Sequence, residues 1–98
     1  MAQRHYVYIM TDEQNSVLYT GRTKDLVRRT REHRAGRGST FTRRFNVHKL
    51  VYYEAAQDAQ AAFAREKRIK AGSRQKKLDL IDDLNPGWRD LYDELAVS

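Results

Sequence analysis

The sequence predicts an α+β domain in which a small, mainly antiparallel three-stranded sheet is flanked by helices, in the order β-β-α-β-α-α-α. Short runs of β-branched and aromatic residues indicate the strands, and capped segments with apolar residues at helical spacing indicate the helices. A length of 98 residues suits one hydrophobic core, so residues 1–98 are expected to form a single domain. Cysteine is absent from the sequence, which excludes disulfides and thiolate metal sites.

Three short segments are expected to form the strands. The first is the continuous apolar run Tyr6–Met10, which is typical of a strand covered on both faces. A polar turn over 11–16 leads to a second strand over 17–19, and Gly21 is expected to end this hairpin. The third strand is expected within 48–54, around the apolar run Leu50–Tyr53.

The first helix is predicted directly after the hairpin. Thr23 or Asp25 can cap it, and it is expected to run to about Ala35, with Gly36 as its stop signal. The segment 36–47 is basic and contains two phenylalanines, and it is expected to be a loop.

Three further helices are predicted in the second half of the chain. Asp58 is a plausible N-cap for a helix that reaches Ala71, and Ser73 can cap the next helix, which 85–87 (Asn-Pro-Gly) ends. A last short helix is indicated by apolar residues at i, i+3, i+4 and i+7, namely Trp88, Leu91, Tyr92 and Leu95.

Positive charge is concentrated in two blocks of a chain whose formal net charge is +6. Residues 22–49 hold ten basic and two acidic side chains, residues 65–77 hold seven basic and one acidic, and residues 79–98 are acidic. Two basic blocks in so small a domain favour a polyanionic partner, namely nucleic acid. Either block alone is equally well explained as a solvated helix face.

Apolar runs in the chain are short. None approaches the roughly 18 residues of a membrane span. The amino end has no apolar signal-peptide core. We therefore expect a cytoplasmic protein with no membrane partner.

Polar residues interrupt the apolar faces of two predicted helices. Glu66 lies on the predicted buried stripe, where a carboxylate needs a cation, a metal ion or several hydrogen-bond donors. The stripe consists of Ala59, Ala62, Phe63 and Ile69. An i,i+4 ion pair with Lys70 is the plain structural alternative.

The first helix carries a similar interruption. Arg29 and His33 share a face with Leu26, which would place both at the edge of the core or in a cleft above it. An ordinary ion pair for the arginine and a satisfied half-buried histidine are the alternatives. Tyr8 and Tyr19 on the paired strands could likewise be packing residues.

In combination these residues resemble a known module. Its pattern is matched by 6–8 (Tyr-Val-Tyr), 18–23 (Leu-Tyr-Thr-Gly-Arg-Thr), the helix residue Arg29, the segment 65–70 around Glu66, and 85–91. The chain is similar to the GIY-YIG nucleases, most closely to small stand-alone bacterial members that resemble the nuclease domain of the excision-repair incision subunit. The resemblance implies a GIY-YIG-like fold, and 6–7 (Tyr-Val) and Thr20 depart from the family pattern at structural positions.

The resemblance also implies roles for individual residues. Tyr8 and Tyr19 would be the tyrosines of the first and second motifs, and Glu66 would bind the metal ion. Arg29 would be the helix arginine and His33 the polar group one turn further on. Asn85 also matches the family, although a role in stopping a helix explains it equally well.

Phosphodiester hydrolysis gives each of these groups a chemical task. A single Mg²⁺ (or Mn²⁺) held by one carboxylate suits Glu66, and a guanidinium such as that of Arg29 can bind the phosphate oxygens. A tyrosine acts as general base only if its pKa, about 10 when free, falls toward 7, a shift of roughly 4 kcal/mol. We expect Tyr19 to be the base, with Tyr8 as its hydrogen-bonded partner or substitute, and His33 to orient water or relay a proton.

The sequence thus predicts a metal-dependent endonuclease that acts on DNA rather than RNA, on structured or single-stranded DNA in repair or recombination, with a repair protein as a possible partner. The alternative is a non-catalytic nucleic-acid-binding or adaptor module on the same fold. The candidate phosphate contacts are Arg22, Lys24, Arg43, Arg44, Lys67 and Lys70.

Overall fold

The computed structural model describes residues 4–96. Its strands are β1 (His5–Thr11), β2 (Leu18–Thr23) and β3 (Lys49–Ala56). Its helices are α1 (Leu26–Arg34), α2 (Thr40–Arg44), α3 (Ala59–Ala71), α4 (Arg74–Leu84) and α5 (Tyr92–Ala96). The predicted α+β class and strand order along the chain are confirmed, and α2 is the one additional element within this described part.

The sheet has the order β2-β1-β3, and both pairings are antiparallel. β1 is therefore the central strand, and β2 lies at one edge. Gly21 stands opposite Tyr8 within the ladder, and β2 continues to Thr23. The expectation that Gly21 ends the hairpin was wrong, because this glycine is needed inside the strand, where the Tyr8 ring passes over it.

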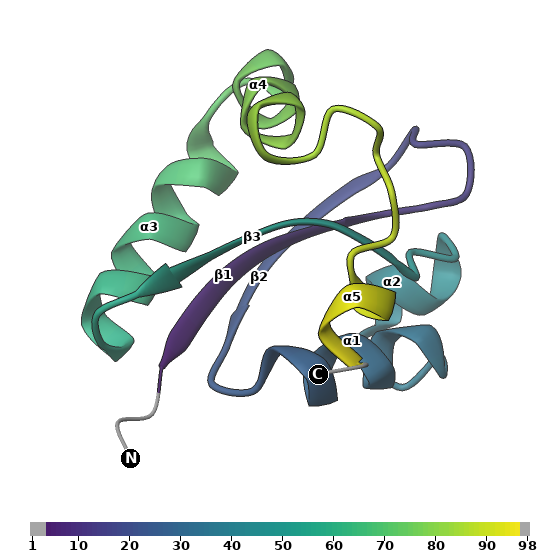
Figure 1. Cartoon of the computed structure of the whole chain (residues 1–98), viewed down its shortest axis with the longest axis horizontal. Helices are drawn as coiled ribbons and strands as arrows, with labels where there is room; N and C mark the ends of the chain where they lie inside the picture. Colours follow the sequence, from purple (N-terminus) through teal and green to yellow (C-terminus); the bar gives the residue numbers. More distant parts are fainter. Residues whose placement is uncertain (1–3, 97–98) are drawn as a thin grey trace.

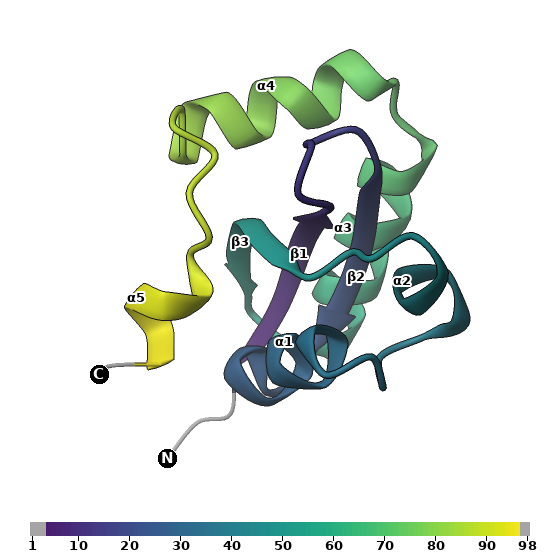
Figure 2. The same cartoon turned by 90° about the vertical axis from the view of Figure 1, so that its right-hand side faces the viewer.

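The helices cover the sheet on both faces (Figures 1 and 2), with α3 and α4 on one face and α1, α2 and α5 on the other. Alternate residues of β1 enter two separate cores, as predicted for a strand covered on both sides. One core contains Val7, Ile9, Val51, Tyr52, Ala62, Ile69 and Ile81. The other contains Tyr8, Met10, Leu26, Val47, Leu50 and Leu91.

The predicted helix caps are confirmed. The side chains of Asp25, Asp58 and Ser73 each accept a backbone N–H three residues further on, at the starts of α1, α3 and α4. Gly36 follows α1 with a φ of +77°, a conformation that favours glycine. In residues 4–96, no helix combines the length and the hydropathy that crossing a bilayer would require.

The structure corrects two expectations for the helices. The segment 36–47 is not only loop, because Ser39 and Thr42 form a reciprocal capping box that starts α2. Trp88 lies outside the last helix, with a φ of 52°, and its indole nitrogen donates to Asp82 at 2.9 Å. α5 begins only at Tyr92.

The apolar stripe predicted for α3 is narrower than expected. Ala62 and Ile69 are buried, but Ala59 is exposed and Phe63 is 51% exposed. The Arg22 guanidinium lies 5.0 Å from the centre of the Phe63 ring, so this phenylalanine packs against a cation at the edge of the sheet rather than in the core.

Candidate active site

The Tyr8 side chain crosses β2 at Gly21. A methyl group added at Gly21 would lie 2.5 Å from the Tyr8 Oη, so only glycine lets the ring lie flat on this strand. The ring is buried, and its hydroxyl reaches α1. Burial raises the pKa of Tyr8 to about 12 against the opposing effect of the Arg29 guanidinium, so Tyr8 is protonated at neutral pH.

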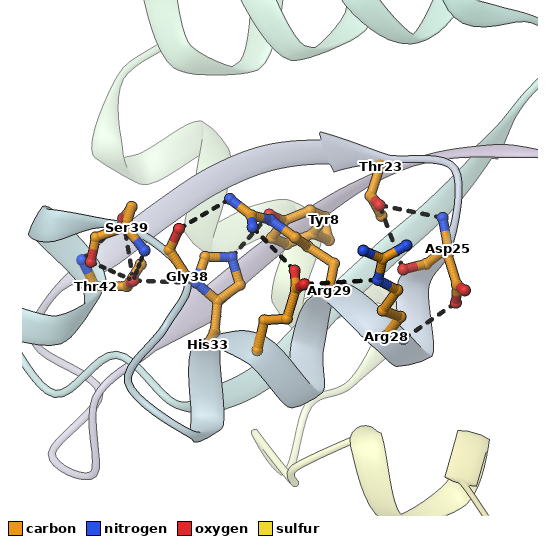
Figure 3. Close-up of polar contacts among 10 residues, drawn as sticks. Tyr8, Thr23, Asp25, Arg28, Arg29, His33, Gly38, Ser39 and Thr42 are labelled. Carbon is orange, nitrogen blue, oxygen red and sulfur yellow. Dashed lines mark hydrogen bonds and ion pairs between the residues drawn. The ribbon is translucent and has the colours of Figure 1, made fainter.

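His33 joins Tyr8 to α2 (Figure 3). Its Nε2 lies 3.0 Å from the Tyr8 Oη, and its Nδ1 lies 3.0 Å from the Thr42 Oγ1. Burial lowers the pKa of His33 to about 4, helped by the nearby Arg29 charge, so the ring is neutral. Because the Thr42 hydroxyl donates to the Ser39 carbonyl, we assign Nδ1 as a donor to Thr42, which leaves Nε2 to accept the Tyr8 proton.

Arg29 extends beside this pair with its guanidinium fixed at two points. It donates to the Glu32 Oε1 at 3.1 Å and to the Gly38 carbonyl at 3.2 Å (Figure 3). Its side chain remains 30% exposed, so part of the guanidinium is free to meet an anion. The loop around Gly38 also touches the histidine, since a methyl group at Gly38 would lie 1.9 Å from the His33 Nδ1.

Tyr19 begins a row of aromatic rings that leads from His33 to the surface. Its ring centre lies 5.3 Å from that of His33 and 5.9 Å from that of Phe41, on which it stacks. Phe41 in turn lies 4.8 Å from Phe45, and both phenylalanines are 41% exposed. Exposed, paired phenylalanines offer a stacking surface for nucleic-acid bases.

Tyr19 and Phe41 line a hollow of about 350 Å³ that crosses the exposed edge of β2. Lys70 and Lys77, which come from the opposite face of the sheet, line its other side. In Figure 2, α2 lies beside β2 and α3 passes behind the same strand. The edge of β2 is therefore where side chains from the two faces meet.

Glu66 reaches this edge from α3. Its side chain is only 12% exposed, and it pairs with Arg22 at 3.2 Å and with Lys70 at 3.0 Å. The predicted i,i+4 ion pair with Lys70 is present, together with the second cation. Among the smaller influences on Tyr8, the Glu66 charge raises the pKa of the phenol.

The other predicted contact residues are more scattered. The side chains of Lys24, Arg43, Arg44 and Lys67 are exposed, the middle two on α2. Asn85 is buried, and its amide group donates to the carbonyls of Val51 and Arg89 and accepts the Arg89 N–H. These hydrogen bonds to backbone groups end α4 and hold the chain that follows it, as expected if Asn85 acts to stop the helix.

Gly38 and Thr42 belong to the site although no sequence pattern predicted them. Both contact His33, and the Gly38 carbonyl also accepts a hydrogen bond from the Arg29 guanidinium. Ser39 is a typical N-cap residue, and it is the local signal that could have indicated α2. Nothing in the sequence indicates that this short helix would meet the His33 ring.

A metal ion would depend mainly on one carboxylate. Within residues 4–96, no three His, Asp or Glu side chains gather closely enough to form a metal cage. Glu66 nevertheless fits Mg²⁺, which keeps several waters and accepts phosphate oxygens as ligands when the protein supplies one or two carboxylates. Arg22 and Lys70 compete for the same oxygens but are 43% and 54% exposed, so both can move away.

The low pKa of His33 predicts a pH-dependent stability. The unfolded histidine titrates near 6.5 and the folded one near 4, so between these values the unfolded chain binds more protons. The free energy of unfolding should fall by on the order of 2–3 kcal/mol as the pH decreases from about 7 to 4. Urea denaturation at a series of pH values measures this loss.

The control for this prediction is His33→Gln. This variant should have a nearly flat stability profile between pH 7 and pH 4.5, because it lacks the group that titrates. Asp12 and Glu32, whose hydrogen bonds lower their pKa values, interfere little in this window, because their contribution to stability is lost mainly below about pH 4.5, where the unfolded carboxyl groups gain protons. An unchanged pH dependence in His33→Gln would contradict the assignment.

The chain was compared with known proteins. The family model described as the GIY-YIG catalytic domain matches residues 4–79. A UPF0213 protein of Haloquadratum walsbyi is 43% identical over 83 residues, which are 85% of this chain and 92% of that protein. A UPF0213 protein of Staphylococcus aureus is 44% identical over 80 residues, covering 81% and 95% of the two chains.

A solved structure is also similar. The solution NMR structure of a UPF0213 protein from Bacillus halodurans has 37% sequence identity and a TM-score of 0.52, and the match covers 86% of this chain and 87% of that one. The predicted GIY-YIG fold is thereby confirmed. By the matched domain and by these relatives, the chain belongs to the GIY-YIG family and to its UPF0213 group.

Proposed function

We propose that residues 1–98 act as one catalytic domain, a metal-dependent endonuclease that hydrolyses phosphodiester bonds in DNA. The observation that carries the proposal is the meeting of two kinds of group at the edge of β2. Tyr19, Tyr8 and Arg29 lie on one side of the strand, and the nearly buried Glu66 reaches it from the other. Membership of a family defined by a catalytic domain that acts on nucleic acid supports the same conclusion.

Arg29 and Glu66 have complementary tasks in this proposal. The part of the Arg29 guanidinium that Glu32 and Gly38 leave free binds the phosphate oxygens, where negative charge increases during attack. Glu66 holds Mg²⁺ or Mn²⁺, which when bound supplies positive charge to the phosphate and the leaving oxygen. Arg22 and Lys70 neutralise the carboxylate until then.

Tyr19 is the proposed general base. It lines the hollow directly, whereas the Tyr8 ring is buried and its hydroxyl is engaged by His33. Tyr8 and His33 therefore hold the aromatic cluster in place through the hydrogen bond between Oη and Nε2.

This assignment predicts different behaviour for the two tyrosine variants. Tyr19→Phe should lower the single-turnover rate by about a hundredfold or more and remove the acidic limb of the pH–rate profile, where the rate rises with pH. Tyr8→Phe should keep that limb and lose less rate, because its hydroxyl acts through His33. A profile that loses its acidic limb only in Tyr8→Phe would reverse the two roles.

Single-stranded or branched DNA is the proposed substrate class, in repair or recombination. The adjacent rings of Phe41 and Phe45 are exposed beside the hollow, and Arg43 and Arg44 flank them on α2. Bases of a duplex are already stacked on one another, so exposed aromatic rings favour unpaired ones. Lys24 and Lys67 are exposed candidates for additional phosphate contacts.

The direct test is cleavage of a panel of labelled DNAs, namely single-stranded, flapped, nicked and duplex, together with a matched RNA. Purified protein with Mg²⁺ or Mn²⁺ should cut unpaired DNA, and EDTA should stop the reaction. A repair protein would be indicated as a partner if its addition raised the rate. Absence of cleavage from every substrate, with either metal, would refute the proposal.

A non-catalytic nucleic-acid-binding or adaptor module is the second candidate function. The observation in its favour is that both oxygens of Glu66 already have cationic partners, Arg22 and Lys70. Such a module would bind DNA with strong salt dependence and cut nothing. The same DNA panel separates the two functions.

Competition between Lys70 and the metal ion gives a further prediction. Lys70→Ala removes a cation 3.0 Å from the Glu66 Oε2, so the Mg²⁺ concentration for half-maximal cleavage should fall by about two- to fivefold. A Mg²⁺ titration of the cleavage rate measures it. Arg74→Ala, which removes an exposed cation at the start of α4 with no assigned role, is the matched control and should leave the half-maximal concentration unchanged. An increase for Lys70→Ala would contradict metal binding at Glu66.

A further inference from the structure

A second hollow lies between α3 and α4, separate from the one that Tyr19 lines. Its volume is about 360 Å³, within the range of pockets that hold small organic groups. Four basic side chains and a single carboxylate, that of Asp79, line it. The four are Arg65, Arg68, Lys76 and Lys77. This balance of charge favours an anion.

The cations of this hollow are not equally available. Arg65 is paired with Glu54 at 3.0 Å, and Lys77 donates to the Gly72 carbonyl at 2.8 Å. By contrast, the side chains of Arg68 and Lys76 have no hydrogen bond or ion pair with any residue in the described part of the chain, and both are exposed. Two unpaired cations at the mouth of one hollow are suited to a phosphate group.

The hollow also has an apolar lining. Ile69 is buried in the core but forms part of the wall, and the half-buried Leu80 lies beside it. A simple inorganic anion would gain nothing from contact with such an apolar surface. A nucleotide would, because its base is a flat, weakly polar ring attached to a phosphate through the sugar.

The two hollows adjoin. Lys77 lines both of them, and Lys70, which lines the first, lies two residues before Gly72, which lines the second. A strand whose phosphate lies beside Tyr19 can therefore continue past Lys70 and Lys77 toward Arg68 and Lys76. It would follow cationic side chains over the whole path.

We propose that the hollow between α3 and α4 binds one nucleotide of single-stranded DNA, on the strand that extends from the candidate active site. Arg68 and Lys76 bind its phosphate, and Ile69 and Leu80 contact its base. The proposal rests on the proposed function for the direction of the strand, but it requires only binding. It makes this hollow a subsite that favours longer unpaired strands over short ones.

The test uses binding without cleavage. ¹⁵N-labelled protein in EDTA is titrated with a 12-nucleotide oligothymidylate, and backbone amide shifts are followed by NMR. The amides of 68–80 should shift together with those around Tyr19. In Arg68→Ala/Lys76→Ala the shifts in 68–80 should be lost, those around Tyr19 should persist, and affinity should fall about tenfold or more.

Salt dependence gives a second readout for the same variants. The slope of log affinity against log salt should decrease by about 1.4 in the double variant, at about 0.7 for each lost contact with a single strand. The matched control is Arg31→Ala/Arg89→Ala, which removes the same charge from side chains that contact Tyr92 and Glu94 instead. The control should keep the wild-type shifts in 68–80 and the larger part of the affinity.

The outcomes separate this inference from the nuclease proposal. Unshifted amides over 68–80, or a double variant that binds with wild-type affinity and salt slope, would overturn the subsite. Failure of the wild-type protein to cleave DNA with metal would overturn the nuclease and leave the binding result standing.

Discussion

Glu66→Gln is expected to reduce the single-turnover rate of DNA cleavage by about a thousandfold, since it removes the negative charge that would hold the metal ion. Glutamine has nearly the same shape, and its amide oxygen can still accept a hydrogen bond from Arg22, which lies 3.2 Å from the carboxylate. The fold should therefore survive, and the loss should be chemical. Rapid-quench cleavage assays with Mg²⁺ measure it.

Binding distinguishes this loss from unfolding. In EDTA, Glu66→Gln should bind single-stranded DNA at least as tightly as wild type, because Arg22 and Lys70 lose their anionic partner. Glu94→Gln is the matched control: it removes one carboxylate that pairs with Arg89 on the exposed surface and should leave cleavage unchanged. Near-wild-type cleavage by Glu66→Gln would exclude the proposed metal site.

The strands and the helix caps could be predicted because their signals are local. A capping side chain such as that of Asp25 or Asp58 acts on backbone groups three residues away, and the run around Val7 has strand propensity wherever it is placed. Gly21 could not be interpreted from local signals. It resembles the end of a strand, but glycine is required there because the Tyr8 ring of the neighbouring strand packs over it, and only the pairing register shows this.

The candidate site was predictable in its members but not in its arrangement. Helical spacing put Arg29 and His33 on the face of Leu26, and the structure has all three on the inner side of α1. Glu66, however, belongs to a helix on the opposite face of the sheet from Tyr8. The two sides meet only because β2 is an edge strand, and no local sequence pattern specifies the order of the strands in the sheet.

The second large effect on stability and cleavage is expected from a substitution at Gly38, in the loop between α1 and α2. Gly38→Ala would bring a methyl carbon to within 1.9 Å of the His33 Nδ1, so the ring or the loop must move. The same loop supplies the carbonyl that fixes Arg29. We expect a loss of about 1–3 kcal/mol in the free energy of unfolding from overpacking, and about a hundredfold loss of cleavage rate from displaced catalytic groups.

Gly36→Ala is the matched control two residues earlier. A methyl group there meets no atom within 4 Å, but the φ of +77° is unfavourable for alanine. It should therefore cost about 1 kcal/mol of stability and leave the cleavage rate of the folded protein unchanged. Two glycines of one loop are thus expected to differ in activity and not only in stability.

A double-mutant cycle identifies the cause. If Gly38→Ala acts through the imidazole, then adding it to His33→Ala, where the ring is gone, should cost much less stability than adding it to wild type. Chemical denaturation of the four proteins gives the coupling energy. Additive losses would mean that the methyl group disturbs the backbone of the loop instead, and that the approach of Gly38 to His33 does not shape the site.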